Sequence, residues 1–253
     1  MRHLPLALAC IALGACTEPV SGGGPTSLSR HVDDSGENRW LSFDGVNDYA
    51  TTATAQFPDG LSPQTISAWF ELDSIGGQQA LVTVRKDLDS GLELAVNDGM
   101  LSAIRVYGER TLVAATKPVT TGGWHFAAYT FDGATNRLYV DGAPAGNSTD
   151  LPDKRTPTSC WLGTLDGKID LLHASLDDVR VYEVARTPNE LAAEAAGNYA
   201  RPDSGLVLEL PFDESGGSTV YDHSSFANDG QLGDGVDERM PARVSPSASD
   251  TPH

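Results

Sequence analysis

Histidine and acidic side chains are the residues of this sequence best suited to catalysis, and their spacing matches no established catalytic pattern. His125 lies in an apolar run, His173 in a predicted strand and His223 in a predicted turn, without a serine motif, HExxH spacing or a Gly-rich phosphate loop. A glycosidase needs a pair of Asp or Glu side chains. Nearly all acidic residues here fall at turns or strand ends, where Asp is favoured for backbone reasons. The sequence predicts a protein that is not an enzyme.

The three cysteines have different expected fates. Cys10 lies within an N-terminal secretory signal, and Cys16 lies at its end. Cys160 then remains alone, so no internal disulfide can form after export. Its neighbours in sequence include no His or acidic partner, which predicts a buried, unreactive thiol rather than a nucleophile.

The N-terminus has the pattern of an export signal. A basic start is followed by an apolar run over residues 4–13, which is shorter than the roughly 20 residues needed to span a bilayer. Leu13-Gly14-Ala15-Cys16 resembles a bacterial lipobox, which implies removal of residues 1–15 and lipidation of Cys16. An ordinary signal peptide is the alternative. By the same resemblance, Thr17 favours the outer membrane of a Gram-negative cell.

The charge of the chain excludes one class of partner. The formal net charge is -18 and the pI is about 4.5, so the surface repels phosphate backbones and anionic lipid, and nucleic acid is not an expected partner. The acidity would serve solubility, or it would supply oxygen ligands for a hard cation such as Ca²⁺.

Short β-rich runs separated by Gly, Asp and Asn turns predict an all-β sandwich from residue 39 onward. Residues 16–38 are polar and Gly/Ser-rich, which predicts a flexible tether. Trp124–Phe131 is apolar on both faces, which predicts an inner strand covered on both sides. Thr187, Pro188 and Glu190 form a helix start that Gly197 ends, and we expect this helix to be a lid on the sandwich edge. Strands are expected at residues 40–44, 65–72, 80–85, 92–96, 101–106, 112–115, 124–131, 137–140, 160–163 and 172–182.

Four segments together resemble the laminin-G-like, concanavalin A-like jelly-roll superfamily. They are LSFDGVNDY from Leu41, TISAWF from Thr65, GWHFAAYTFDG from Gly123 with LYVDG from Leu138, and LDDVRVY from Leu176 with Ala185-Arg186-Thr187. They occur in the order of the family and cover residues 39–198. The resemblance implies a concanavalin A-like (laminin-G-like) jelly-roll β-sandwich, all-β with one short helix. This fold hosts many functions, so the resemblance is informative mainly about structure.

The segment 199–237 resembles the beginning of such a domain, although it follows the domain here. About thirty residues cannot bury a core of their own. It is therefore either a truncated second repeat or, as we favour, a permuted strand that completes the same sandwich through Leu206, Leu208 and Leu210. Residues 238–253 are Pro/Ser-rich and are predicted to form a disordered tail.

The resemblance also implies candidate sites. Relatives of this fold often hold a structural Ca²⁺ at one edge, and the matching positions are Asp44, Asn47, Asp48 and Asp177. The alternative at Asp44 is an Asx-turn. Modules of this fold commonly bind glycans through exposed aromatic rings, for which the candidates are Trp69, Tyr107 and Trp161, each of which could instead belong to the core.

These observations predict a surface-anchored, non-catalytic recognition or adhesion module that binds a glycan or another surface protein and contacts the membrane only through its lipid anchor. A purely structural lipoprotein without a small ligand is the first alternative, and a carbohydrate-active enzyme is the second. Binding predicts an exposed aromatic or polar groove, a scaffold predicts an exposed apolar patch, and an enzyme predicts two converging carboxylates.

Overall fold

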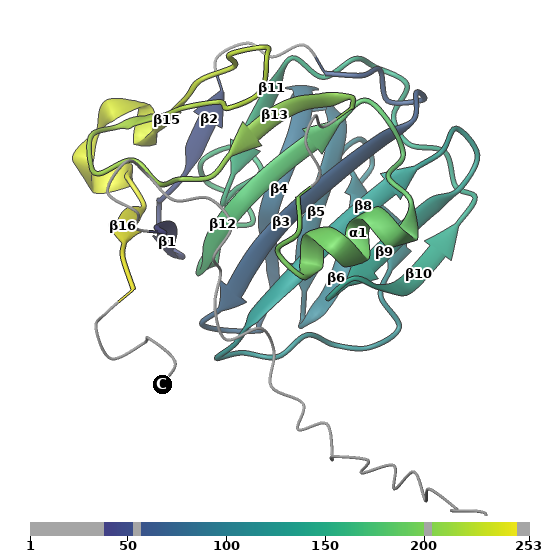
Figure 1. Ribbon diagram of the computed structural model, residues 1–253, viewed down its shortest axis with the longest axis horizontal. Helices are drawn as coiled ribbons and strands as arrows, with labels where there is room; N and C mark the ends of the chain where they lie inside the picture. Colours follow the sequence, from purple (N-terminus) through teal and green to yellow (C-terminus); the bar gives the residue numbers. More distant parts are fainter. Residues whose placement is uncertain (1–37, 53–56, 200–203, 247–253) are drawn as a thin grey trace, which may run out of the picture.

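Alternating apolar residues build two eight-stranded antiparallel sheets in the computed structural model, which describes residues 38–52, 57–199 and 204–246 (Figure 1). In sheet A the order is β10 (Ala143–Ser148), β9 (Asn136–Val140), β8 (Trp124–Phe131), β3 (Gln64–Leu72), β12 (His173–Tyr182), β1 (Trp40–Asp44) and β16 (Ala242–Val244), with β13 (Leu206–Leu210) also pairing with β12. In sheet B it is β14 (Thr219–Val220), β15 (Gly230–Leu232), β2 (Ala50–Thr52), β11 (Ser159–Leu162), β4 (Gln78–Asp87), β5 (Ser90–Asn97), β6 (Met100–Arg105) and β7 (Arg110–Ala114).

The core lies between the two sheets and confirms the predicted β-sandwich. Inward positions of both sheets, such as Phe43, Ile66 and Leu176 from sheet A and Val82 and Leu94 from sheet B, form one buried apolar cluster. Each of the ten predicted strands is present, whereas β2, β10, β14, β15 and β16 were not predicted. The sequence of β10, APAGNS, is poor in strand-forming residues, and β10 pairs only at the edge of sheet A.

Helix α1 (Pro188–Ala195) begins with the predicted capping box, in which the Thr187 side chain accepts from Glu190 N and Glu190 bonds back to the Thr187 backbone. The helix does not form a lid on the sandwich edge. It lies on the outer face of sheet A, where Leu191 packs with Phe126 and Tyr139 (Figure 1). The reason is apolar coverage: β8 carries large side chains on its outer face as well, and the helix shields them from water.

Strand β12 organises both ends of the chain. Its first half pairs with β1, in the register Leu41↔Leu176, and its second half pairs with β13, in the register Val179↔Leu210. The strand β13 is buried along its whole length, and β15 then pairs with β2 in sheet B. Residues 204–232 therefore contribute strands to both sheets of the sandwich.

The predicted disorder of residues 238–253 is wrong for their first part. Strand β16 pairs with β1, and the Arg243 guanidinium is bonded to the Glu214 carboxylate at 2.6 Å and to the carbonyl oxygens of Phe212 and Thr219. Composition alone misses such a strand, because its stability comes from one arginine that joins segments distant in sequence. Residues 247–253 lie outside the described residues.

Candidate functional site on the outer face of sheet B

The outer face of sheet B carries a row of polar side chains around one tryptophan. Ala50, Leu162 and Val82 point into the core, so the residues next to them point outward. Backbone pairing aligns these outward residues across the strands, in the order Thr219, Gln231, Thr51, Trp161, Thr83 and Glu93. The strands thus bring together side chains that are up to 180 positions apart in the sequence, since Thr51 and Gln231 belong to one row.

A solvent-open depression of about 430 Å³ lies at one end of this row. This volume is in the range of small-molecule sites. The phenol of Tyr49 donates a hydrogen bond to the Asp234 carboxylate over 2.8 Å and so fixes one wall. The lining offers hydroxyl, amide and carboxylate groups together with apolar surface, and its residues are Thr51, Thr219, Asp229, Gly230, Gln231 and Asp234.

Trp161 stands beside the depression in a three-part stack. Its ring lies 5.7 Å from the Tyr49 ring with an angle of 27° between the planes, and the Arg85 guanidinium lies 4.3 Å from the indole centroid. Tyr49 precedes Ala50, which pairs with Leu162, and Arg85 pairs with Ser159. The two side chains therefore approach Trp161 from opposite directions along β11. The indole is half-buried, and Trp161 pairs across the strands with Thr51, which lines the depression.

Arg85 is nearly buried on this face, with 7% of its surface exposed. Its Nε and Nη1 groups are buried, and no acceptor among the described residues bonds to either group. Burial lowers the pKa of the guanidinium, while the charges of Asp166 and Asp87 act in the opposite direction without forming an ion pair. The site therefore contains a cation that the described residues do not neutralise by direct contact.

Two carboxyl groups converge farther along the row. The Gln78 amide nitrogen donates to Glu93 and to Asp170, over 3.0 Å in each case. Burial raises the pKa of Glu93 to about 8, and the Asp170 charge adds to the effect. Such a pair could serve glycoside hydrolysis in an open cleft. Glu93 is only 2% exposed, so it is covered rather than presented to a substrate.

Trp69, one of the three predicted ligand-binding aromatics, is buried and cannot stack on a sugar. It is 1% exposed and packs with Phe126 beneath helix α1. The prediction was wrong because the sequence pattern does not reveal that the outer face of sheet A is covered. Tyr107 is 59% exposed at the turn after β6, and the Arg155 guanidinium lies 5.7 Å from its ring. Trp161 is the predicted aromatic that borders the depression.

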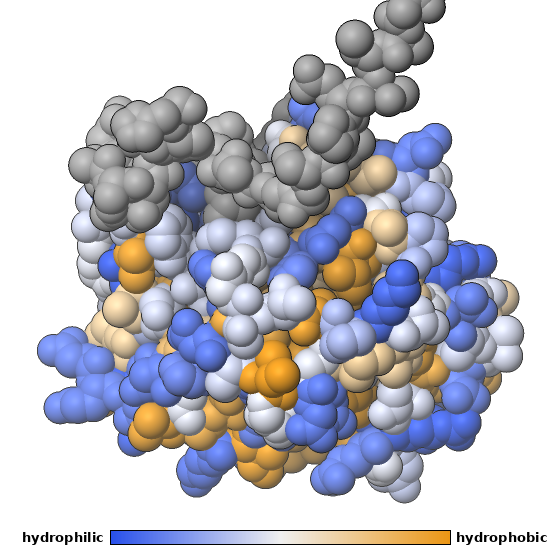
Figure 2. All heavy atoms as spheres, turned by 90° about the horizontal axis from the view of Figure 1, so that it is seen from below, coloured by the Kyte–Doolittle hydropathy of each residue, from blue (hydrophilic) through white to orange (hydrophobic). Residues whose placement is uncertain are grey.

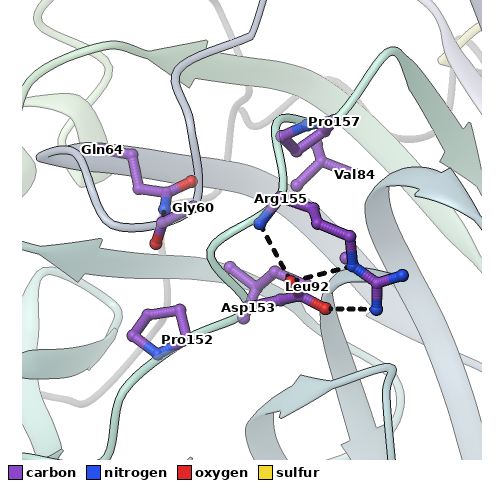
Figure 3. Close-up of a pocket in the computed structure, with 9 residues that line it drawn as sticks. Gly60, Gln64, Val84, Leu92, Pro152, Asp153, Arg155 and Pro157 are labelled. Carbon is purple, nitrogen blue, oxygen red and sulfur yellow. Dashed lines mark hydrogen bonds and ion pairs between the residues drawn. The ribbon is translucent and has the colours of Figure 1, made fainter. Parts of the chain in front are cut away.

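A second cavity lies beside Arg155, near Tyr107 (Figure 3). Asp153 and Arg155 close one side through hydrogen bonds, including one of 3.0 Å from Nη2 to Oδ2, and Gln64 at the start of β3 lines the facing side. The cavity has a volume of about 10 Å³, which suits one water molecule. It is too small to hold a sugar.

The four predicted calcium ligands do not converge. Asp44 Oδ1 accepts from the backbone of Val46 at 2.8 Å, which is the Asx-turn alternative, and Asp48 Oδ2 accepts from Asp44 N at 3.0 Å. Asn47 lies in the same turn. Asp177 follows the position paired with Leu41, so it lies about 13 Å along β12 from the level of Asp44. No group of three His, Cys, Asp or Glu side chains in the described parts of the chain is arranged to hold a metal.

Asp177 has a different environment. Its carboxylate accepts from Asp178 N at 2.8 Å and from the Asn38 amide at 3.3 Å, and it is 1% exposed. Burial raises its pKa well above the usual value, and the charges of Asp178 and Asp213 add to this effect. These contacts tie the start of β1 to the bulge in β12, which is a structural role.

His125 makes contacts that the sequence did not predict. Its Nδ1 lies 3.0 Å from Asp141 Oδ2, and its Nε2 lies 3.0 Å from Thr120 Oγ1. The Thr120 backbone N–H also donates to Nε2 at 3.3 Å, so this nitrogen is an acceptor and Nδ1 carries the proton toward Asp141. The ring faces Phe70 at 5.8 Å. The cluster resembles a hydroxyl–imidazole–carboxylate relay, and it joins the loop before β8 to the turn after β9.

The two remaining predicted positions are the cysteines Cys160 and Cys16. Cys160 is fully buried in the core, and burial raises the pKa of its thiol. Cys16 lies outside the described residues. No helix among the described residues is long and apolar enough to cross a membrane.

Sequence reasoning missed Tyr49, Arg85 and Gln231. Tyr49 lies in the first family segment, and Arg85 is the last residue of a predicted strand, but neither was predicted to be a site residue. The alternation in 80–85 places Arg85 opposite to Val84, which could have marked it as a charge on the outer face of an inner strand. Nothing in the local sequence indicates that Gln231 lies beside Thr51.

Comparison with solved structures supports the fold. A candidate carbohydrate-binding protein from Bacteroides ovatus aligns with a TM-score of 0.62 and 20% identity over 84% of this chain, which spans 61% of the length of that protein. A heptameric SAP-like pentraxin from Limulus polyphemus aligns with a TM-score of 0.55 and 14% identity, over 68% of this chain and 88% of its own. No curated protein sequence matches the chain significantly.

A family model matches more than half of the sequence. It covers residues 44–192, from the end of β1 to the middle of α1, and it describes the concanavalin A-like lectin/glucanases superfamily. This range contains the strands that form the centres of both sheets. The chain belongs to the concanavalin A-like lectin/glucanases superfamily.

Proposed function

We propose that this protein is a non-catalytic glycan-binding module that acts at the cell surface, with its binding site on the outer face of sheet B. The observation that carries the proposal is the polar depression of about 430 Å³ beside the Trp161 stack. Sugars present hydroxyl groups and small apolar faces, and this surface offers matching hydrogen-bond partners next to an aromatic edge. The similarity to a candidate carbohydrate-binding protein of Bacteroides ovatus supports the same ligand class.

Two observations favour this function over its alternatives. Hydrophobic residues on the face seen in Figure 2 are interspersed with hydrophilic ones, whereas a scaffold that docks a partner through apolar contacts would present one continuous patch. Among the carboxyl groups, Glu93 and Asp170 converge as a hydrolase would require, but Glu93 is shielded from solvent. The proposed binding site is therefore the solvent-open depression and not the Glu93–Asp170 pair.

The site is tested by binding of a glycan panel to the full chain and to Gln231→Ala. Gln231 is exposed and lines the depression, so its loss should weaken binding at least tenfold without changing the melting temperature. The matched control is Asn189→Ala, which removes an exposed amide on α1, on the opposite side of the sandwich. Equal affinity of Gln231→Ala and the parent chain for every bound glycan would place the site elsewhere, and the absence of any glycan binding would refute the function.

Surface anchoring is the second part of the proposal. It is supported by the lipobox resemblance at Leu13-Gly14-Ala15-Cys16. We expect Cys16→Ser to move the protein from the membrane fraction to the soluble fraction and to abolish fatty-acid labelling, while Cys10→Ser leaves both unchanged. Continued membrane association of the Cys16 variant would contradict a lipid anchor.

A further inference from the structure

We infer that the glycan bound on the outer face of sheet B is acidic, and that the Arg85 guanidinium binds a carboxylate of one of its sugars. This inference rests on the proposed glycan-binding function. Arg85 is 7% exposed, and its Nε and Nη1 groups have no acceptor among the described residues. A buried donor without an acceptor destabilises the free protein, and the cost is greater when the donor is charged. An anionic ligand group would remove this cost.

The protein has acidic groups close to Arg85 but does not use them as partners. Asp87 and Asp166 influence the guanidinium through their charges, yet neither carboxylate lies within 4.0 Å of it. Asp87 Oδ1 accepts from the Ser90 hydroxyl at 2.8 Å and lies 3.8 Å from the Arg155 guanidinium. The Asp87 carboxylate is thus bonded to other groups.

The surroundings of Arg85 also orient it. The guanidinium lies 4.3 Å from the Trp161 centroid, and stacking of this kind fixes the plane of the group. Its pairing partner on β5 is Gly91, which has no side chain, and a Cβ there would lie 2.7 Å from the Cβ of Arg85. The planar group offers adjacent N–H donors that match the two oxygens of a carboxylate. Among the described residues no carboxylate forms an ion pair with the group, so these donors are not committed to a partner inside the protein.

The charge around the site determines which acidic glycans fit. Asp229 and Asp234 line the depression, and the whole chain has a net charge of -18. This field repels a densely charged polymer, whereas a single carboxylate needs only the one contact with Arg85, and charges farther than about 8 Å from it are largely screened. The ligand class is therefore an oligosaccharide with a sparse carboxylate, such as one uronic acid residue among neutral sugars, and not a polysulfated chain.

The test uses matched ligands with the full chain: oligosaccharides that contain one uronic acid residue, and the same oligosaccharides after reduction of the carboxyl group to an alcohol. Calorimetry should show at least tenfold tighter binding of the acidic forms. Arg85→Met keeps most of the apolar stem over Trp161, and it should weaken binding of the acidic forms to the affinity of the reduced forms, which removes this preference. Arg85→Lys keeps the charge without the planar donors and should retain only part of the preference.

The possible failures are distinguishable. If reduced and acidic forms bind equally well, and Arg85→Met changes neither affinity, the acidic-ligand inference is wrong while the glycan-binding function stands. If a polysulfated oligosaccharide binds more tightly than the single-carboxylate forms, the sparse-charge specificity is wrong. If no oligosaccharide binds in either form, both the inference and the proposed function fail. Melting curves of both Arg85 variants show whether each remains folded.

Discussion

The outer faces of the two sheets treat buried charge in opposite ways. On sheet A, Arg180 is fully buried and bonds to Glu209 at 3.0 Å and to Asp178 at 3.0 Å, while Arg186 bonds to the buried Glu194 at 3.0 Å. On sheet B, Arg85 has no carboxylate in contact, and Glu93 and Asp170 share an amide instead of an arginine. Paired charges hold a structure together, whereas an unpaired one is available to a ligand.

The coverage of the two faces fits this difference. Helix α1 covers part of sheet A, and Tyr199 closes over Arg180 at 3.7 Å from the guanidinium carbon to its ring centroid. Sheet B carries the solvent-open depression, and no α-helix in the described part of the chain covers it. The comparison teaches that the same residue type, an arginine on the outer face of a central strand, serves stability on one side and is suited to recognition on the other.

The largest expected effect is on the paired face. Glu209→Ala leaves Arg180 buried with one carboxylate fewer and should lower the free energy of unfolding by about 3–5 kcal/mol. Chemical denaturation measures this loss. Glu209→Gln keeps an acceptor oxygen and should lose clearly less. A loss below about 1 kcal/mol in the alanine variant would mean that the pairing on sheet A is not what holds this face together.

The next effect concerns pH and the shared carboxyl pair of sheet B. In the folded protein Glu93 keeps its proton up to about pH 8, whereas an unfolded chain releases it near 4.5. The folded state thus binds more protons in this window, so this group's contribution to stability is complete below about 4.5 and is lost as pH rises to about 8. The loss should be several kcal/mol, because one unit of pKa difference corresponds to about 1.4 kcal/mol.

Glu93→Gln should remove this pH dependence. Its free energy of unfolding should match that of the parent near pH 4.5 and exceed it near pH 8, by denaturation at each pH. Parallel curves for the two proteins would show that Glu93 titrates normally in the folded state.

A smaller effect is expected at the unpaired arginine. Arg85→Met removes a buried charge without a partner and should change the free energy of unfolding by less than about 1 kcal/mol, or raise it. Thermal and chemical denaturation should agree on this near-neutral result. A loss as large as that of Glu209→Ala would remove the contrast between the two faces and would assign Arg85 a structural role.

Calcium should have the smallest effect. Asp44 and Asp48 already accept backbone N–H groups and supply two carboxylates, and Ca²⁺ prefers six to eight oxygen ligands. The melting temperature should therefore be nearly equal in chelator and in millimolar Ca²⁺. A stabilisation near 2.7 kcal/mol, which corresponds to about a hundredfold excess over Kd, that disappears in Asp44→Ala would restore the predicted calcium site.

Local signals in the sequence determined much of this protein. The capping box at Thr187 and the apolar strand Trp124–Phe131 both depend on residues close together in the chain, and both are present in the structure. The ordered family segments indicated the sandwich for the same reason, since each is a strand with its turn. The burial of Cys160 followed from the absence of any reactive partner beside it.

Tertiary structure alone decided the site. Whether Trp69 reaches solvent depends on where helix α1 packs. Trp161 also lies in a predicted strand, and the local sequence does not show which of the two tryptophans is covered. The depression joins Thr51 to Gln231, and the isolation of Arg85 depends on where Asp87 and Asp166 point. Strand pairing between distant segments sets these contacts, and a local pattern carries no information on which strands will pair.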